Sequence, residues 1–457
     1  MSKHLAIDIG ASSGRHILGF YENGKLEIKE VYRFENGLQN INGSLCWDIE
    51  SLLNEVKNGI KACKEQGYTP DTIAIDTWGV DYVLIDSAGK EIMPAYAYRD
   101  ERTYAVIDEV ESIIPPYELY SKTGEQKQAF NTIYQLYCDK KAGRLDKAAH
   151  FLMMPAYLSY KLTGVAKNEY TLATTGALVN AKTKEWDMEV ISKLGLPEKL
   201  FDKLALPAEY IGNLTKEMQD FVGFDAAVVC APSHDTAAAV AACPLEEDGM
   251  YISSGTWSLI GAENTEAILT EKACEFNFAN EGGVDYRFRF LKNYMGMWLI
   301  QNIRRNINKE KTYDEMMFLA KESDFVEYID VNDKSFVAPE NMIEAIRTYL
   351  GKKDLPLGDV LNSVYHSLAK SYVTAVREME DLTGKTIKKI NIVGGGCADK
   401  YLNELTAKYT GKPVVAGPKE ATAIGNLIIQ AIYSNPELDL EFMRKVVKTS
   451  FDIEEVR

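Results

Sequence analysis

The stretch Leu5-Ala6-Ile7-Asp8-Ile9-Gly10-Ala11-Ser12-Ser13-Gly14-Arg15 decides the fold of this chain. An apolar run ends in an aspartate and opens into a turn of small residues, and a second apolar segment, residues 16–20, follows in place of a helix. Asn23-Gly24 then predicts a tight hairpin turn, because this dipeptide tolerates the positive φ that such turns need. The stretch therefore predicts two strands joined by a Gly/Ser turn.

A turn of this kind can hold a phosphate group. Its backbone N–H groups form a cradle for phosphate oxygens, and an acidic side chain beside it, here Asp8, can hold a hydrated divalent cation. The spacing of Gly10 and Gly14 differs from the G-x-G-x-x-G fingerprint, and the chain contains no G-x-x-x-x-G-K-[ST] motif. Taken alone, the motif is compatible with a nucleotide phosphate clamp and with an ordinary structural turn.

A second copy of the scheme favours the clamp. Residues 250–261 read Met-Tyr-Ile-Ser-Ser-Gly-Thr-Trp-Ser-Leu-Ile-Gly, which is again an apolar strand, a small polar turn and an apolar strand. Two halves of the chain would then each contribute a hairpin to one nucleotide. At 457 residues the chain also exceeds what one hydrophobic core usually organises. We therefore predict two domains, residues 1–243 and 244–457.

Charge and cysteine content narrow the function classes. A formal net charge of −16 disfavours nucleic acid or an anionic membrane as the main partner. No apolar run approaches the roughly 20 residues that cross a bilayer, and the N-terminus has no signal-peptide core. The seven cysteines are scattered without a C-x-x-C motif, which is typical of reduced thiols in a cytoplasm. No pattern in the sequence indicates an oligomeric state.

Strands alternate with longer helical patterns along the chain, which predicts an α/β fold. Residues 72–76 and 82–86 predict a second strand pair around Trp78-Gly79, and residues 113–162 are predicted to be mostly helical. In the second half, the expected elements are a strand at 390–393, a helix at 399–409, a short strand at 414–415 and a helix at 420–432.

The strongest candidate for a catalytic site is the turn Pro232-Ser233-His234-Asp235-Thr236. It follows a short apolar strand and precedes an alanine-rich helix, so Asp235 would be displayed at a strand end, where ligands bind in α/β folds. A carboxylate there can accept a proton from an attacking hydroxyl. Asp235 could equally cap the helix, and His234 is a rival base or a hydrogen-bonded loop histidine.

Two further regions carry weaker signals. Gly394-Gly395-Gly396 lies between a predicted strand and a predicted helix, where glycine lets the backbone approach a flat ligand or simply pack closely. Residues 76–81 and 98–103 mix polar groups with aromatic rings, which suits a sugar but also a surface cluster of ion pairs.

Taken together, the motifs resemble the FGGY family of carbohydrate kinases, within the actin/hexokinase/heat-shock ATPase superfamily. The resemblance runs nearly from end to end, through residues 8–15, 76–82, 98–100, 234–236, 254–258 and 393–397. Most members have threonine after the first glycine of the clamp, whereas Ala11-Ser12-Ser13-Gly14-Arg15 is similar to the members that phosphorylate L-rhamnulose.

The resemblance implies two ribonuclease-H-like domains that flank a deep cleft for ATP and sugar. Asp235 would be the general base, and Asp8 and Asp235 would hold hydrated Mg²⁺. The residues implied to bind the nucleotide are Ala11, Ser12, Ser13, Gly14, Arg15, Thr256, Gln301, Gly394, Gly395 and Gly396. Those implied to bind the sugar are Gly79, His234, Asp235, Thr236 and Asn293. Gln301 has less distinctive surroundings and could be a helix-surface amide.

The expected reaction is phosphorylation of L-rhamnulose by ATP at its 1-hydroxyl, with small-molecule substrates as the only partners implied. Another ketose or polyol, such as L-fuculose, D-xylulose or glycerol, would use the same machinery. A non-catalytic nucleotide- and sugar-binding regulator would be expected to lack the base, and Asp235 argues against it. A chaperone-like ATPase shares the clamp but needs a peptide-binding region, for which the chain has no surplus length.

Overall fold

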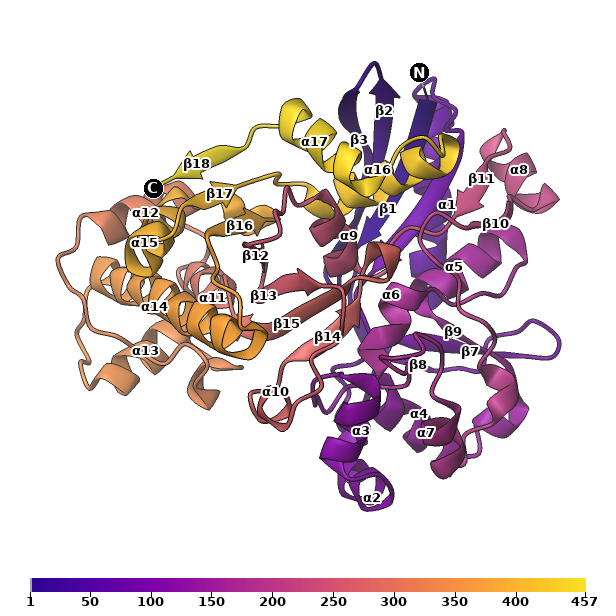
Figure 1. Ribbon diagram of the computed structural model, residues 1–457, viewed down its shortest axis with the longest axis horizontal. Helices are drawn as coiled ribbons and strands as arrows, with labels where there is room; N and C mark the ends of the chain where they lie inside the picture. The colour runs from indigo at the N-terminus through magenta and orange to yellow at the C-terminus, as the bar shows by residue number, and fades with distance from the viewer. Residues whose placement is uncertain (1) are drawn as a thin grey trace. The chain divides into compact units, whose positions relative to one another are not determined.

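The computed structural model describes residues 2–457, and its contacts divide the chain into two compact units (Figure 1). The first unit contains the chain up to Ala242 together with Glu263–Phe290 and Thr422–Ser450. The second contains Cys243–Ala262, Leu291–Ala421 and Phe451–Arg457. Each unit is assembled from separated segments, whereas the sequence predicted a single division near residue 243.

The first unit contains most of the elements. Its strands are β1 (Ser2–Ile9), β2 (Ser13–Glu22), β3 (Lys25–Glu35), β4 (Leu38–Ile41), β5 (Ser44–Trp47), β6 (Thr72–Thr77), β7 (Tyr82–Asp86), β8 (Ala95–Tyr96), β9 (Ala148–Met153), β10 (Tyr210–Asn213), β11 (Ala227–Val229) and β14 (Ala279–Gly282). Its helices are α1 (Ile49–Glu65), α2 (Ile107–Ile113), α3 (Pro116–Thr123), α4 (Thr132–Lys141), α5 (Met154–Thr163), α6 (Tyr170–Ala173), α7 (Met188–Lys193), α8 (Lys216–Val222), α9 (Asp235–Ala242), α10 (Glu271–Glu275), α16 (Ala421–Ser434) and α17 (Leu440–Ser450).

The second unit is organised around one long helix. Its strands are β12 (Gly249–Ser254), β16 (Lys389–Val393), β17 (Val414–Ala416) and β18 (Glu454–Val456), with β13 (Trp257–Asn264) and β15 (Phe288–Met295) crossing the unit boundary along the chain. Its helices are α11 (Trp298–Asn306), α12 (Tyr313–Lys321), α13 (Met342–Leu350), α14 (Leu357–Thr383) and α15 (Lys400–Thr410). Helices α12, α13 and α15 pack against α14 (Figure 1).

The two main sheets share one strand pattern. The first has the order β10-β11-β6-β1-β2-β3, in which β1 runs antiparallel to β2 and parallel to β6. The second has the order β14-β15-β13-β12-β16-β17-β18, in which β12 runs antiparallel to β13 and parallel to β16. The repeat predicted from residues 5–15 and 250–261 is confirmed, because each copy forms a hairpin that is followed in its sheet by a parallel strand.

The hairpin turn predicted at Asn23-Gly24 is also confirmed. Strand β2 pairs with β3 through a turn in which Asn23 has φ of 52° and Gly24 has φ of 75°. These positive values match the right-handed twist of the flanking strands, which is why Asn-Gly is favoured there.

The second predicted strand pair is wrong in its pairing. Residues 72–77 and 82–86 are both strands, but β6 lies in the six-stranded sheet while β7 pairs antiparallel with β9 in a separate two-stranded sheet. Between them Val80 has φ of 67°, a rare value for a β-branched residue, which redirects the chain. Strand β9 also interrupts the region that was predicted to be mostly helical.

Two further features of the described part of the chain concern membrane spans and cysteines. No helix among residues 2–457 is long and apolar enough to cross a membrane. All seven cysteines are free thiols in this structure.

Helix α16 approaches the backbone of α9 unusually closely within the first unit. A Cβ atom added at Gly425 would lie 1.7 Å from the carbonyl oxygen of Ala238. The next residue, Asn426, donates a hydrogen bond of 2.6 Å to Asp76 on β6. Since α9 begins at Asp235, this glycine contact fixes the position of the helix that carries the candidate base.

We expect Gly425→Ala to destabilise the protein. Alanine favours a helix by up to ~1 kcal/mol over glycine, but a side-chain atom forced against a backbone oxygen costs more, and we expect a net loss of about 2 kcal/mol. Denaturant unfolding measures this loss. Gly37→Ala is the matched control, because a Cβ at Gly37 has no atom within 4 Å. Equal unfolding midpoints for the two variants would contradict the close packing.

Candidate active site

The first Gly/Ser turn is held from beneath by an asparagine. The Gly10 N–H donates to the Ser13 carbonyl at 2.9 Å, which closes the turn. Asn36, which follows β3, donates its backbone N–H to the Ser12 carbonyl at 3.0 Å and its side-chain amide to the Gly10 carbonyl at 2.9 Å. Ser12 and Ser13 are exposed and Ala11 is half-buried, so the turn faces outward as a phosphate cradle must. The sequence analysis missed Asn36.

Gly14 has a packing role that its predicted nucleotide contact did not anticipate. The residue is buried, and a Cβ there would lie 2.1 Å from the Phe34 ring. Glycine is therefore required at this position by the neighbouring strand β3, whatever the turn binds.

Asp8 and Arg15 form an ion pair across the hairpin. The two residues are directly opposite in the β1–β2 register, and the Arg15 guanidinium donates from Nε at 2.9 Å and from a terminal nitrogen at 2.8 Å to one Asp8 oxygen. Such a charge-assisted pair is strong and directional. Arg15, predicted to hold phosphate, thus also neutralises the acidic residue beside the turn.

Asp76 adds a second carboxylate that the sequence analysis did not assign to the site. It is the parallel register partner of Asp8 on β6 and is fully buried. One carboxylate oxygen accepts the Asn426 amide, and the other has no hydrogen-bond partner among the described residues. Burial and the carboxylates of Asp8 and Asp235 raise the pKa of Asp76 well above its usual range. The available signal was its position at the end of a predicted strand.

The carboxylates fit the Mg²⁺ ion that the family resemblance implies. Residues 2–457 contain no group of three His, Cys, Asp or Glu side chains arranged as metal ligands. Mg²⁺ needs none, because it keeps several water molecules and uses one or two carboxylates with substrate phosphates. The unpartnered oxygen of Asp76, beside Asp8 and Asp235, is the acceptor such a hydrated cation would complete.

The predicted turn at residues 232–236 lies beside these strand ends. Residue 234 forms an isolated parallel bridge with Thr77, the last residue of β6, and the Thr77 N–H donates to the Ser233 carbonyl at 2.9 Å. Asp235 is the first residue of α9, and its side chain remains 33% exposed. Burial of the remainder raises its pKa, with the Asp8 carboxylate acting in the same direction and His234 opposing both.

Gly79 and His234, which are both predicted to bind the sugar, lie close together. A Cβ at Gly79 would lie 3.5 Å from His234 Nε2 and 3.2 Å from the Thr175 hydroxyl. The same hydroxyl accepts the Val80 N–H at 3.1 Å, and the Val80 carbonyl accepts the Thr132 hydroxyl at 2.7 Å. These bonds hold Val80 in its strained conformation, and strain of this kind is concentrated at functional sites.

Thr236 completes this group of residues. Its hydroxyl donates to an Asp235 carboxylate oxygen at 3.1 Å, so it orients the candidate base directly. The structure thus brings together Asp8, the 11–15 turn, Gly79 and residues 234–236 within the first unit.

The remaining predicted residues lie in the second unit. The Gly255 N–H donates to the Trp257 carbonyl at 2.9 Å, which closes the second turn. The Thr256 hydroxyl donates to the side-chain oxygen of Gln301 at 3.3 Å, so this amide is directed at the turn. Asn293 on β15 has a buried side-chain oxygen with no hydrogen-bond partner among the described residues, which leaves it available to a ligand.

The three predicted glycines of the second unit differ in their surroundings. Gly394 has φ of 83°, and a Cβ at Gly396 would lie 2.0 Å from the Ser254 hydroxyl. Both are therefore required for close packing on the end of β12. A Cβ at Gly395 would have no atom within 4 Å, so this glycine borders open space.

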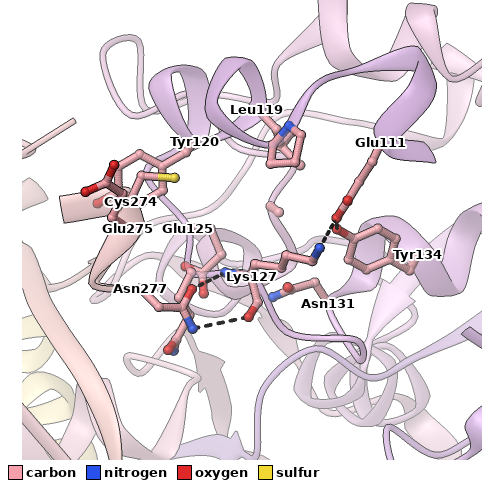
Figure 2. Close-up of a pocket in the computed structure, with 13 residues that line it drawn as sticks. Glu111, Leu119, Tyr120, Glu125, Lys127, Asn131, Tyr134, Cys274, Glu275 and Asn277 are labelled. Carbon is pink, nitrogen blue, oxygen red and sulfur yellow. Dashed lines mark hydrogen bonds and ion pairs between the residues drawn. The ribbon is translucent and has the colours of Figure 1, made fainter. Parts of the chain in front are cut away.

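A separate cavity of about 330 Å³ opens in the first unit, and none of the predicted site residues lines it (Figure 2). Lys127 pairs with Glu111 at its wall, and Glu125 lines it with a buried carboxylate oxygen that has no hydrogen-bond partner among the described residues.

Comparison with known proteins gives the chain its context. Rhamnulokinases from Halalkalibacterium halodurans and Oceanobacillus iheyensis are each 46% identical, covering 99% and 98% of this chain and 98% and 97% of their own lengths. The Bacillus subtilis rhamnulokinase is 42% identical over 98% of this chain and 94% of its own.

Solved structures support the fold. The gluconate kinase of Lactobacillus acidophilus superimposes with a TM-score of 0.81 at 15% identity, covering 100% of this chain and 93% of that chain. The Plasmodium falciparum glycerol kinase with ADP gives 0.77 at 14% identity, covering 100% and 94%. The N-terminal domain model of the FGGY family of carbohydrate kinases matches residues 4–242, and the C-terminal domain model matches residues 250–434. The chain therefore belongs to the FGGY family of carbohydrate kinases.

Proposed function

We propose that this protein transfers the γ-phosphoryl group of ATP to the 1-hydroxyl of L-rhamnulose, giving ADP and L-rhamnulose 1-phosphate. The main structural support for phosphoryl transfer is Asp235. Its carboxylate is partly exposed, has a raised pKa and lies at the strand ends of the first unit. The choice of sugar is supported by relatives named rhamnulokinase that are 46% identical over nearly the whole chain. The unpaired thiols agree with a cytoplasmic enzyme.

Asp235 acts as the general base. Its raised pKa makes the carboxylate a stronger proton acceptor than an ordinary aspartate. The sugar hydroxyl would lose its proton to this oxygen as it attacks the γ-phosphorus. Thr236 holds the base in position through its hydroxyl, and His234 and Gly79 border the place of the sugar.

We assign a phosphate-binding role to each of the two turns. Ala11, Ser12 and Ser13 of the first turn present backbone N–H groups, and Thr256 of the second presents a hydroxyl. Asp8, Asp76 and Asp235 would hold hydrated Mg²⁺, which when bound neutralises phosphate charge. Because phosphoryl transfer has a loose transition state, positioning and charge neutralisation supply most of the catalysis.

The first experiment is ADP release with Mg-ATP across a panel of sugars that includes L-rhamnulose, L-fuculose, D-xylulose and glycerol. We expect strong stimulation by L-rhamnulose alone. Stimulation by a different sugar would support kinase activity but identify another substrate. ADP release that is independent of sugar, or absent with every sugar, would overturn the proposal in favour of an ATPase or a binding protein.

We expect Asp235→Asn to lower kcat by about 10²–10⁴ while nucleotide affinity stays close to that of the parent, because only proton acceptance is lost. Asparagine caps helices as well as aspartate does, so a capping role predicts an unchanged enzyme. Asp187→Asn is the matched control, since Asp187 caps α7 in the same unit. Activity of Asp235→Asn within about tenfold of the parent would exclude Asp235 as the base.

Variants of Gly395 and Gly396 can distinguish a role in nucleotide binding from a role in packing. We expect Gly395→Ala to leave stability within ~0.5 kcal/mol but to weaken ATP binding, because the new methyl group enters open space that we assign to adenosine. Gly396→Ala forces a methyl group against Ser254 and should lower the unfolding midpoint instead. Calorimetric ATP titration and thermal unfolding measure the two effects. Unchanged ATP affinity in Gly395→Ala would show that this residue does not line the nucleotide pocket.

A further inference from the structure

Glu169 is a buried acidic residue of the first unit that the mechanism has not used. It directly precedes α6, and its backbone is fixed by an isolated parallel bridge with Ala205, whose carbonyl accepts the Tyr170 N–H at 2.9 Å. Its carboxylate accepts five hydrogen bonds, all from uncharged donors. The donors are the N–H and hydroxyl groups of Thr171 and Ser233 and the N–H of Leu172.

Both oxygens of Glu169 act as acceptors, because three of the five donors are backbone N–H groups that can only donate. The Thr171 N–H bonds Oε1 at 2.7 Å, and the N–H groups of Leu172 and Ser233 bond Oε2 at 3.2 and 3.1 Å. Burial raises the pKa of Glu169, and the donors of Ser233 and Thr171 oppose that rise. The side chain is therefore held in one position by two segments of the chain.

The first of these segments begins at Ser233, which lies between Glu169 and the end of β6. The Ser233 hydroxyl donates to Glu169 Oε2 at 2.5 Å, and its N–H donates to the same oxygen. Its carbonyl accepts the Thr77 N–H at 2.9 Å, so every polar group of this buried serine is bonded. The next two residues are His234 and Asp235. The direction in which the chain leaves Ser233 therefore determines where the Asp235 carboxylate lies.

The second segment is α6, which the same carboxylate caps through the N–H groups of its first turn. The helix leads directly into Thr175, whose hydroxyl lies 3.2 Å from the position of a Cβ at Gly79 and accepts the Val80 N–H. Glu169 thus joins the segment that carries the candidate base to the segment that supports the sugar-binding turn at Gly79.

From these contacts we propose that Glu169 is a positioning residue for phosphoryl transfer, which acts through Ser233 to hold Asp235 in place beside the end of β6. This inference rests on the proposed function for the role of Asp235, but the contacts that carry it do not depend on which sugar is bound. A misplacement of about 1 Å can lower the rate of a reaction by roughly 10². Glu169 therefore acts on proton transfer without touching the sugar or the nucleotide.

Glu169→Asp separates the two contacts of this carboxylate. Aspartate is a preferred N-cap, so α6 is retained, while the carboxylate is withdrawn from Ser233 by one methylene, about 1.5 Å. We expect kcat to fall roughly ten- to a hundredfold. The KM for ATP should be little changed, because the turn at residues 11–15 is supported by Asn36 and not by Glu169.

Ser233→Ala shows whether Glu169 acts through Ser233. It removes the hydroxyl bond and leaves the N–H bond, so we expect a smaller fall in kcat than in Glu169→Asp. The two losses should not be independent, because both variants break the same contact. We therefore expect the double variant to have the kcat of Glu169→Asp alone. Losses that multiply in the double variant would indicate two separate structural effects and would overturn the proposal.

Asp187→Ala is the matched control for the loss of a helix cap. Asp187 is a buried carboxylate of the first unit that caps α7 by accepting the Val190 N–H and also accepts the Asn180 amide. We expect this variant to have a lower unfolding midpoint and the kcat of the parent. An equal fall in kcat in Asp187→Ala and Glu169→Asp would overturn the proposal, because any lost cap would then have the same effect.

Crystal structures of the parent and the variants give a readout that needs no activity. In Glu169→Asp we expect residues 233–236 to move relative to β6 by about 1 Å, the scale at which rates suffer, and in Asp187→Ala to stay in place. An unmoved turn, or an unchanged kcat in a folded Glu169→Asp, would overturn the proposal. If Glu169→Asp does not fold, Ser233→Ala takes its place in both comparisons. If the parent phosphorylates no sugar, the proposed function fails, while the position of the turn still decides this inference.

Discussion

Mutual repulsion among carboxylates is the constraint on which the site depends. Asp8, Asp76 and Asp235 interact through space in a chain whose net charge is already −16. The protein offsets this repulsion with few groups, chiefly the Arg15 guanidinium on Asp8 and the Asn426 amide on Asp76. The compensation is incomplete, since an oxygen of Asp76 has no hydrogen-bond partner among the described residues. Burial, together with this incomplete compensation, is what raises the pKa of Asp76.

The elements that were predictable from sequence are those specified locally. The hairpin around Asn23-Gly24 and the repeated strand–turn–strand at residues 250–261 depend on turn residues and apolar runs that neighbour each other in the chain. Asp235 at a strand end was predictable for the same reason. Assignment of these motifs to the carbohydrate kinases came from the resemblance and was then confirmed by the family models.

What was missed depends on tertiary contacts. Asn36 supports the turn at Gly10 from 26 residues away, and Glu281 meets His234 only after β14 has joined the first unit. The pairing of β7 was mispredicted because Val80 takes a positive φ that its side chain disfavours, and this conformation is maintained by Thr175 and Thr132. A residue whose role depends on a partner far away in the sequence leaves no local sequence pattern that would identify it.

The discontinuous first unit affects how this protein can emerge from the ribosome. Residues 422–450 complete that unit, and Gln430 on α16 bonds both the Leu5 carbonyl and the Thr72 hydroxyl of the central strands. These strands lie within residues 2–77, and the helix that covers them, residues 421–434, is synthesised long after them. At roughly 5–20 residues per second, the nascent sheet waits tens of seconds with an apolar face uncovered. The first unit can therefore complete its fold only after residues 422–450 have been synthesised.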